Sequence, residues 1–386
     1  MGFHLSQHLI SLLLLTCAPS ALACRTTNAS HSTNLLSGND YCPAANVICN
    51  DGTDMYLSVT SVPSISKNES ARTDPSSTML HEQDFGAPPS PLYTITPIPS
   101  KGLGLIALLP IPRGTVIILE SPLLTVPMPS LSPGKGYPLA TMLSSLTSSY
   151  STLSHQSKTL FLSLHNHRFP GDETSTPPQS DLLTIFRSNA YNTGESDVGL
   201  FPLIARINHD CRPNSVNYWS EGMGKRVIYA GKDIGVGEEI TVTYIPLLKP
   251  VKDRRGRLAQ YGFTCACEAC REEDEGVTGS GKRRGKIADL MDVLEQKVQV
   301  RSEKKLVNER LVKRMERLLG LLREEGLVEV EYWVKAFRFG AVFSERAGDL
   351  KGARRLVERE LEELRLAEED SSEIEAALER LGRLKR

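Results

Sequence analysis

Apolar and polar positions divide the chain into regions of different periodicity. Short apolar runs separated by Pro and Gly begin at Leu92 and predict β-strands with tight connections. These runs are Leu92–Ile98, Gly104–Leu109, Thr115–Leu119, Leu123–Val126, Val216–Tyr218, Val227–Ala230 and Ile240–Tyr244. Residues 139–166 have apolar side chains at helical spacing, and the pattern beyond Gly281 is helical almost to the end of the chain. The pattern predicts an α+β fold followed by an α-helical C-terminal region at residues 281–386.

Residues 24–91 carry little periodicity. They are rich in Ser, Thr, Pro and Asn, poor in charge, and end in a Pro-rich run at 87–91. A segment of this composition buries too little apolar surface to fold, so we expect a low-complexity, disordered spacer.

The N-terminus has the pattern of an export signal. Leu9–Leu15 is nearly all apolar, and Ala21–Ala23 has the small-x-small spacing of a cleavage site, which predicts a signal peptide at residues 1–23. No Lys or Arg precedes the apolar run, and the alternatives are a mispredicted first exon or a short buried helix. Because the run is too short to cross a bilayer, no transmembrane span is expected in the mature chain.

Two further features of the N-terminal region are compatible with secretion. Sequons stand at Asn28 and Asn68. Cys42 and Cys49 are spaced for a small disulfide loop, which would leave Cys24 over.

Overall charge gives no indication of a nucleic-acid partner. The formal net charge of the 386 residues is −1, and 40% of them are hydrophobic. A large basic excess is what favours non-specific attraction to phosphate, so direct nucleic-acid binding is not expected.

Four cysteines in the second half of the chain predict a zinc site. Cys265, Cys267 and Cys270 lie within six residues, and Cys211 is the distant fourth. Disulfides or buried free thiols are the alternatives, but Cys265 and Cys267 are too close in sequence for a relaxed disulfide. Four thiolates leave no open position on Zn²⁺, so the site is expected to be structural. His165-Asn166-His167 has no acidic or Cys partner nearby and is expected to be a surface loop.

Two other segments suggest a ligand site. Asn208 and His209, beside Cys211, offer directional hydrogen-bonding groups. Gly102–Ala107 matches the G-x-G-x-x-A dinucleotide pattern, with Glu120 near the distance of a ribose-binding acid. Prolines on both sides prevent the helix that this pattern requires, so a tight turn between strands is expected, either approaching a ligand or as a plain hairpin.

Four motifs together resemble the SET-domain protein lysine methyltransferases. The resemblance covers residues 92–271, with an insert at about 127–190. The motifs are Lys101-Gly102-Leu103-Gly104-Leu105, Arg206-Ile207-Asn208-His209-Asp210-Cys211-Arg212-Pro213-Asn214, Gly237-Glu238-Glu239-Ile240-Thr241-Val242-Thr243-Tyr244 and Cys265-x-Cys267-x-x-Cys270. The last is similar to the post-SET cysteines, which the SMYD group completes with the Cys of the Asn-His segment. No cysteines for a MYND finger stand between Cys49 and Cys211, so the chain looks more like fungal-type SET proteins without that finger.

The resemblance implies a fold, a cofactor and roles for individual residues. The fold would be a set of small sheets around a pseudoknot, with a post-SET zinc knuckle and a helical C-terminal domain. S-adenosylmethionine would be the methyl donor and zinc the structural metal. The cofactor-binding residues would be Lys101, Gly102, Leu103, Gly104, Asn189, Asn208, His209, Tyr244 and Phe263. Tyr244 and Tyr261 would be catalytic, as walls of the lysine slot.

Three functions remain open from the sequence. The first is transfer of methyl groups to lysines of a protein, histones among the candidates, by a monomer. The second is a non-catalytic SET module that serves as a scaffold. The third is a secreted, disulfide-stapled protein in which the SET fold is a relic. The enzyme class is expected in the nucleus or cytoplasm, which conflicts with the predicted signal peptide.

Overall fold

The computed structural model describes residues 91–128, 139–169, 179–194, 197–274, 279–300, 302, 304–367 and 372–385. The predicted signal peptide, the sequons and the N-terminal cysteines lie outside the described residues, as does nearly all of the predicted spacer.

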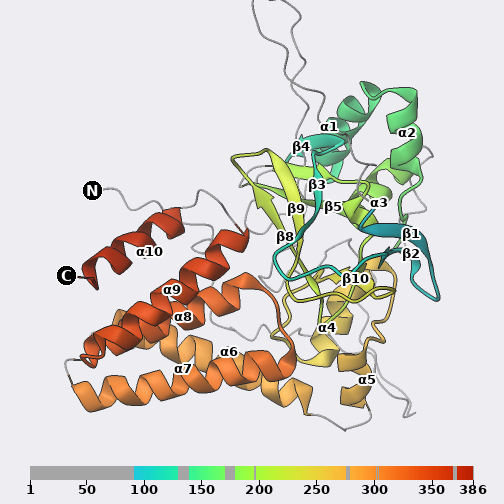
Figure 1. Cartoon of the computed structure of the whole chain (residues 1–386). Helices are drawn as coiled ribbons and strands as arrows, with labels where there is room; N and C mark the ends of the chain where they lie inside the picture. The colour runs from blue at the N-terminus through green and yellow to red at the C-terminus, as the bar shows by residue number, and fades with distance from the viewer. Residues whose placement is uncertain are drawn as a thin grey trace, which may run out of the picture.

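In the part of the chain that the structure describes, ten short strands form three small sheets (Figure 1). In chain order they are β1 (Tyr93–Ile98), β2 (Gly102–Ala107), β3 (Val116–Glu120), β4 (Leu124–Pro127), β5 (Ala190–Thr193), β6 (Asp197–Leu200), β7 (Asn208–His209), β8 (Ser215–Ser220), β9 (Lys225–Ala230) and β10 (Glu239–Val242). The sheet orders are β1-β2-β10-β7, β3-β9-β8 and β4-β6-β5. The predicted strands are confirmed.

The β1–β2 hairpin distinguishes the two interpretations of the glycine motif, a dinucleotide-binding turn and a tight connection between strands. Residues 102–107 form a strand that pairs antiparallel with β1, from Ile98↔Gly102 to Tyr93↔Ala107. Gly102 has φ +79°, a conformation that glycine adopts without strain. A strand in this position excludes the dinucleotide-binding alternative and confirms the tight connection between strands.

β7, the shortest of the described strands, lies at the edge of the β1-β2-β10-β7 sheet. It pairs in parallel with β10, through Asn208↔Thr241 and His209↔Val242, while β10 also pairs with β2. A 3-10 turn, η3 (Ile204–Arg206), leads directly into it. The Asn-His segment is therefore held against the strand that ends just before Tyr244.

The insert between β4 and β5 is helical. Its helices are α1 (Leu139–Ser151), α2 (His155–Leu162) and α3 (Gln179–Asn189). The helical spacing at 139–166 is confirmed, with a break at Ser154, whose side chain accepts a hydrogen bond from Ser157 N and so begins α2. Met142, Leu146, Phe161 and other buried side chains give the insert its own core against β4 and β6.

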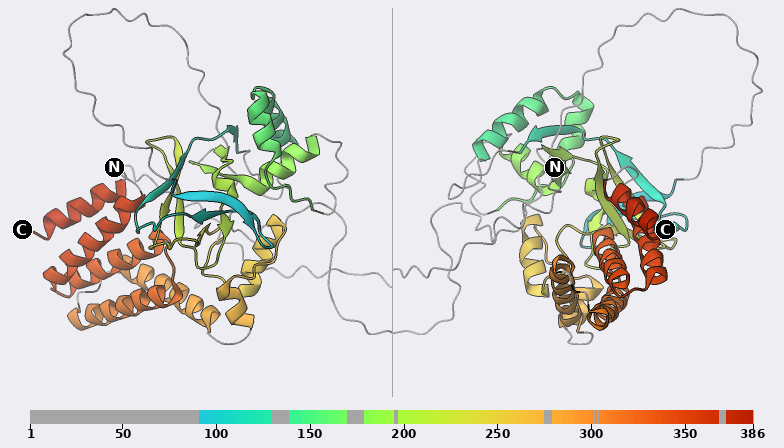
Figure 2. Two further views of the ribbon diagram at one scale, coloured as in Figure 1. Left: turned by 45° about the vertical axis from the view of Figure 1, so that its right-hand side comes forward. Right: turned by 90° about the vertical axis from the view of Figure 1, so that its left-hand side faces the viewer.

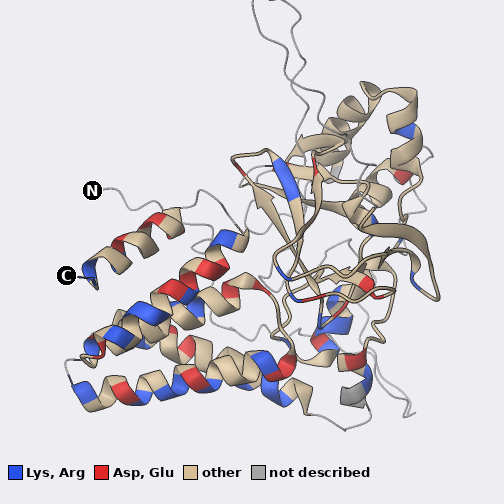
Figure 3. Cartoon of the chain, viewed as in Figure 1, with Lys and Arg blue, Asp and Glu red and all other residues tan. Residues whose placement is uncertain are grey.

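The C-terminal part is a helical layer on one side of the strands (Figure 2). After α4 (Val251–Leu258), η4 (Ala259–Tyr261) and α5 (Glu268–Asp274), it consists of α6 (Ser280–Gln299), α7 (Lys305–Glu325), α8 (Val330–Arg346), α9 (Leu350–Ala367) and α10 (Ser372–Arg383). Charged residues are frequent along these helices, whereas most strand residues are uncharged (Figure 3). Apolar stripes face inward, as on α7 at Leu311, Met315, Leu318 and Leu322.

One buried cluster joins the cysteine site to these helices. Its members include Cys211, Leu247, Cys265, Cys270, Ile287, Leu294, Leu318 and Phe337, and Tyr244, Tyr261 and Phe263 pack against it. The helical layer and the predicted site therefore share a single core.

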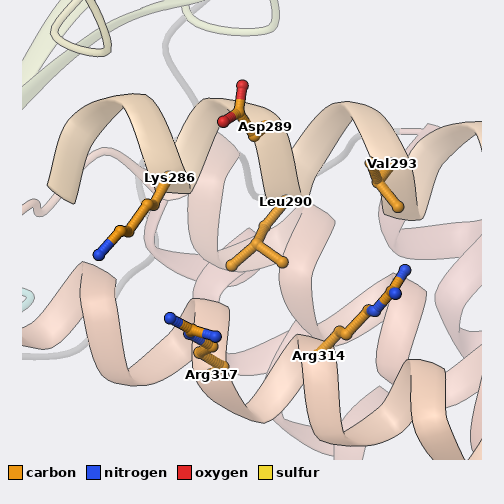
Figure 4. Close-up of a pocket in the computed structure, with 6 residues that line it drawn as sticks. All are labelled: Lys286, Asp289, Leu290, Val293, Arg314 and Arg317. Atoms are coloured by element: carbon orange, nitrogen blue, oxygen red, sulfur yellow. The ribbon is translucent and has the colours of Figure 1, made fainter. Parts of the chain in front are cut away.

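A groove of about 330 Å³ hollows the surface between α6 and α7 (Figure 4). Its lining residues are Lys286, Asp289, Leu290, Val293, Arg314 and Arg317. Lys286 lies two residues beyond the fully buried Arg284, about 200° around the helix. The groove therefore occupies the face of α6 turned away from Arg284.

Within the described residues, no helix combines the length and apolarity that a membrane crossing needs.

Candidate functional site

The four predicted zinc ligands lie together. The sulfur atoms of Cys211, Cys265, Cys267 and Cys270 are all within 4.8 Å of one another. The Cys211–Cys270 sulfur separation is 3.7 Å, close to the edge of about 3.8 Å that a tetrahedron with Zn–S bonds of about 2.3 Å requires. Cys211 and Cys270 are fully buried, so four soft donors face one another away from solvent. This donor set fits a structural zinc ion.

The four thiols share hydrogen bonds that lower the pKa of Cys267 and Cys270 and raise the pKa of Cys211 and Cys265. Hydrogen bonds from Cys211, Cys265 and Cys267 lower the pKa of the Cys270 thiol well below its ordinary value. Cys211, the thiol at the centre of these bonds, has its own pKa raised because it is the donor. A thiolate is the form that binds zinc, so zinc binding would displace the protons that Cys211 and Cys265 hold in the metal-free protein.

Arg254 is a residue of this site that the sequence did not reveal. Its side chain, on α4, is fully buried, and its guanidinium donates to Lys249 O at 2.8 Å and to the Cys270 sulfur at 3.7 Å. Four thiolates around Zn²⁺ leave a net negative charge in a buried place, which a cation beside the sulfur compensates.

Replacing Arg254 by Met should weaken zinc retention. The substitution keeps most of the packing but leaves the thiolate charge uncompensated, and loss of such a neighbour typically costs about 10- to 100-fold in metal affinity. Zinc transfer to a chelating dye measures the effect. Lys252→Met, an exposed cation on the same helix, is the matched control and should release zinc at the parental rate. Equal release from both variants would show that Arg254 does not support the metal.

His209 links the metal site to the strand ahead of Tyr244. Burial lowers the pKa of His209 to about 3, so its imidazole is neutral. Nδ1 accepts a hydrogen bond from Tyr244 N at 3.1 Å, which places the ring proton on Nε2, 3.4 Å from the Cys211 sulfur. Both ring nitrogens are therefore engaged inside the protein, and a cofactor contact of His209 would fall on its main chain or ring face.

Asn208 ties the glycine motif to the Gly-Glu-Glu motif. Its amide nitrogen donates to Leu103 O at 3.1 Å and to Glu239 Oε1 at 2.8 Å. Lys101 forms an ion pair of 2.6 Å with the other oxygen of Glu239. A Cβ at Gly104 would lie 2.7 Å from the Asn208 amide nitrogen, so only glycine permits this approach. Three motifs that are far apart in the sequence thus meet at one place.

Aromatic rings cover the same place. The Tyr244 ring centroid is 5.1 Å from that of Tyr261 and 5.4 Å from that of His209, and the Phe263 ring is 6.4 Å from Tyr244 in an edge-to-face arrangement. The Tyr244 hydroxyl donates to Ile207 O at 2.5 Å. Burial raises the pKa of Tyr244 well above its ordinary value, so the phenol is neutral.

Tyr191 is a second site residue that sequence reasoning missed. It lies on β5 and is near enough to Tyr244 and Tyr261 for the ionisation of each to affect the others. The guanidinium of Arg226 stacks over its ring at 4.8 Å. Its place two residues after Asn189 is the signal that could have identified it.

The helical insert contacts the site through a loop. Asn189 is buried, and its amide nitrogen donates to His165 O at 2.7 Å. The His165 ring is 3.0 Å from Tyr261 O, and a Cβ at Gly262 would strike the His167 ring. The 165–167 segment is a loop, as predicted, but it supports Tyr261 and Asn189 rather than standing free.

Glu120 has a different role from the one its spacing suggested. Its carboxylate accepts hydrogen bonds from Leu203 N at 2.9 Å and Ile204 N at 2.8 Å, and so caps the start of η3. Burial raises the pKa of Glu120 from its ordinary 4.5 to about 7, against the lowering effect of these two bonds. Glu120 therefore anchors the turn that leads into Asn208.

Stability should depend on pH through Glu120. Because the folded carboxyl binds its proton more tightly than the unfolded one, the free energy of unfolding should fall by roughly 3 kcal/mol as pH rises from 4.5 to about 7. Urea unfolding at about pH 5 and about pH 7.5 measures this loss. Glu120→Gln should lose less stability over that range than the parent, whereas Glu221→Gln at an exposed position should keep the parental slope. Equal slopes for the parent and Glu120→Gln would contradict the assignment.

Comparison with known proteins agrees with this geometry. The family described as SET domain matches residues 102–245. Histone-lysine N-methyltransferase set5 of Schizosaccharomyces pombe is 32% identical over 200 residues, which cover 52% of this chain and 54% of that protein. N-lysine methyltransferase SMYD2-B of Danio rerio is 35% identical over 127 residues, covering 31% and 29%. Human histone-lysine N-methyltransferase SMYD3 is 34% identical over 114 residues, covering 27% and 26%.

The matched part spans about half the length of the Schizosaccharomyces pombe protein and less of the other two. Among solved structures, the SET domain of LSMT bound to lysine and AdoHcy matches 70% of this chain and 91% of that chain, with 13% identity and a TM-score of 0.28. The matched residues 102–245 contain the glycine, Asn-His and Gly-Glu-Glu motifs that the fold brings together. Residues 102–245 therefore match the SET domain family, and the chain is similar over part of its length to proteins named lysine methyltransferases.

Proposed function

We propose that this chain is an S-adenosylmethionine-dependent protein-lysine N-methyltransferase. The proposal rests mainly on the arrangement of three residues in the SET domain. Asn208 binds the glycine motif, and the rings of Tyr244 and Phe263 are in contact beside it. The segment that carries Asn208 also supplies Cys211 to the four-cysteine site. The relatives' names, with histone-lysine in two of those cited, support a protein substrate and make histones the first candidates.

The surfaces around the Asn-His segment fit a nucleoside with a charged amino-acid tail. Leu103 exposes 40% of its side chain on β2, and the Phe263 ring is half-buried beside His209. Asn208 and Lys101 add polar groups nearby, and both are bonded to the Glu239 carboxylate. A flat apolar face next to amide and charged groups is the combination that such a ligand needs.

The rings of Tyr244, Tyr261 and Phe263 would orient the acceptor amine and remove water from it. S-adenosylmethionine, when bound, supplies an electrophilic methyl group. The Tyr244 phenol is fixed by its bond to Ile207 O and stays neutral, so its oxygen can accept a hydrogen bond from an amine without removing its proton. The rings of Tyr244 and Tyr261 would exclude water from a lysine bound against them, which would favour its neutral form and align it for in-line attack.

Two measurements test the proposal. Calorimetry should show S-adenosylmethionine binding, and labelled methyl groups should pass to lysines of histone peptides or of a whole lysate. Binding without transfer to any protein would favour the alternative, a non-catalytic SET scaffold. Alkylation of the unreduced protein followed by mass spectrometry should find the four site cysteines unoxidised. Disulfides among them would favour the secreted, stapled alternative.

The place of action in the cell is a separate proposal. A nuclear or cytoplasmic enzyme fits the substrate class, whereas residues 1–23 favour the secretory pathway. N-terminal sequencing of the mature chain, together with localisation of a C-terminally tagged protein, distinguishes the two.

A further inference from the structure

Arg284 is a fully buried arginine whose partners come from three separate segments. It lies on α6, and its side chain is 0% exposed. Its guanidinium donates to Cys211 O at 2.7 Å, to Leu247 O at 2.8 Å and to Glu325 Oε1 at 2.9 Å. Removing a charged side chain from water costs solvation free energy. Here the loss is offset because each guanidinium nitrogen has an oxygen acceptor.

The two main-chain acceptors follow a strand pair that is very short. β7 and β10 pair in parallel only at Asn208↔Thr241 and His209↔Val242, and Asp210 N adds a bond of 3.1 Å to Val242 O. Cys211 comes next on one segment, and Leu247 lies five residues beyond Val242 on the other. The guanidinium therefore bridges the two segments at the point where the β-ladder stops.

Each bridged segment carries part of the candidate site. Cys211 is the distant cysteine of the metal cluster and stands two residues after His209. Leu247 stands three residues after Tyr244, whose main-chain N–H is bonded to the His209 ring. A change in the spacing of the two segments would move the cysteine and the tyrosine relative to each other.

Glu325 fixes the orientation of Arg284. This carboxylate, at the end of α7, is fully buried and also accepts hydrogen bonds from the Ser280 hydroxyl and from Arg283 Nε, the latter at 2.8 Å. Arg212, the residue after Cys211, places its Nε 3.6 Å from the same carboxylate. The C-terminal helices thus hold the guanidinium rigidly against the SET segments.

We propose that Arg284 is a positioning residue for the metal-binding and cofactor-binding segments. By joining Cys211 O to Leu247 O it sets the register of the Asn-His segment against the Tyr244 segment, so that the C-terminal helical region is part of the site. The inference rests on the proposed function for its cofactor, and on the cysteine geometry alone for its metal.

Arg284→Lys tests the bridge while keeping the charge. One ammonium cannot reproduce the fork that reaches two carbonyls and a carboxylate. The full-length variant should bind S-adenosylmethionine about tenfold more weakly and release zinc to a chelating dye about tenfold faster than the parent, at a temperature where circular dichroism shows both folded. Lys286→Met, on the opposite face of the same helix, should match the parent in both. Parental affinity and zinc release in folded Arg284→Lys would overturn the proposal.

A double variant separates positioning from stability. Arg284→Met with Glu325→Leu removes both buried charges, an exchange that often preserves stability, but supplies no donor to the carbonyls. We expect a folded protein that still shows weakened cofactor affinity and faster zinc release. Parental cofactor affinity and parental zinc release in the double variant would show that Arg284 contributes only to stability. The same two measurements test the proposal if Arg284→Lys does not fold.

The zinc measurement keeps this inference distinct from the proposed function. A parent that retains zinc but binds no S-adenosylmethionine would refute the proposed function, and the zinc release of Arg284→Lys would still decide the role of Arg284.

Discussion

Replacing Cys211 by Ala should abolish zinc retention and reduce S-adenosylmethionine binding to a small fraction of the parental value. Cys211 is the only one of the four cysteines that comes from the Asn-His segment, so through zinc its thiolate would join this segment to residues 265–270. Binding to a structural zinc site supplies folding free energy, on the order of 10 kcal/mol in small zinc domains. The contacts around the cysteines are too weak to compensate for a loss of folding free energy of that size.

The coupling to the cofactor follows from the contacts of the knuckle. Phe263 stands two residues before Cys265, and its ring packs near His209. His209 in turn faces the Cys211 sulfur through Nε2 and holds Tyr244 N through Nδ1. Without the metal, the knuckle no longer holds Phe263 and Tyr261 over the Asn-His segment.

Elemental analysis, calorimetry and thermal melts measure the three consequences of Cys211→Ala. The parent should carry one zinc per chain, and the variant none. Cys24→Ala, at a cysteine outside both the cluster and the predicted Cys42–Cys49 disulfide, is the matched control and should keep zinc, cofactor binding and melting temperature. A folded Cys211→Ala protein with parental cofactor affinity would show that the metal and the cofactor segment are independent.

The sequence predicted those parts of the site that depend on local spacing. The three cysteines of the knuckle are within six residues, and the Asn208–Cys211 run is contiguous, so their proximity needs no knowledge of the fold. Seven of the described strands were predictable because they are short apolar runs separated by Pro and Gly, whereas β5, β6 and β7 were not predicted. The position of the glycine motif in a hairpin followed from the prolines that exclude a helix.

The parts that escaped prediction depend on contacts between distant residues. Arg284 and Arg254 lie in charge-rich segments beside arginines that are only partly buried, and nothing in their immediate neighbours distinguishes the two that are fully buried. The 165–167 loop meets Tyr261 across 96 residues. Partners of this kind are set by how the insert and the C-terminal helices pack, which periodicity does not specify.

His209 shows a third limit. Its residue type and its neighbours suggested a ligand for the cofactor, but its ring nitrogens are engaged by Tyr244 N and the Cys211 sulfur. A sequence pattern identifies which side chains belong to a site, whereas the direction in which each ring nitrogen points depends on the folded backbone.

Tyr244→Phe should lower turnover by about a hundredfold or more while changing S-adenosylmethionine affinity by less than about threefold. The substitution removes only the phenolic hydroxyl group. Removal of one polar group that acts on the reacting atoms typically lowers the rate about 10²- to 10³-fold. The Tyr244 ring remains, with its contacts to His209 and Tyr261, so the walls of the slot are kept. Single-turnover methyl transfer to a validated substrate measures the rate, and calorimetry measures the affinity.

Tyr229→Phe is the matched control for this prediction. Tyr229 is a buried tyrosine on β9 whose hydroxyl has no hydrogen-bond partner among the described residues, so its removal should leave the rate unchanged. A Tyr244→Phe protein that transfers methyl groups at the parental rate would mean that the hydroxyl serves only to hold Ile207 O, and that another group orients the lysine. Loss of rate together with loss of cofactor affinity would instead assign the hydroxyl a role in shaping the Asn-His segment, since Ile207 directly precedes Asn208.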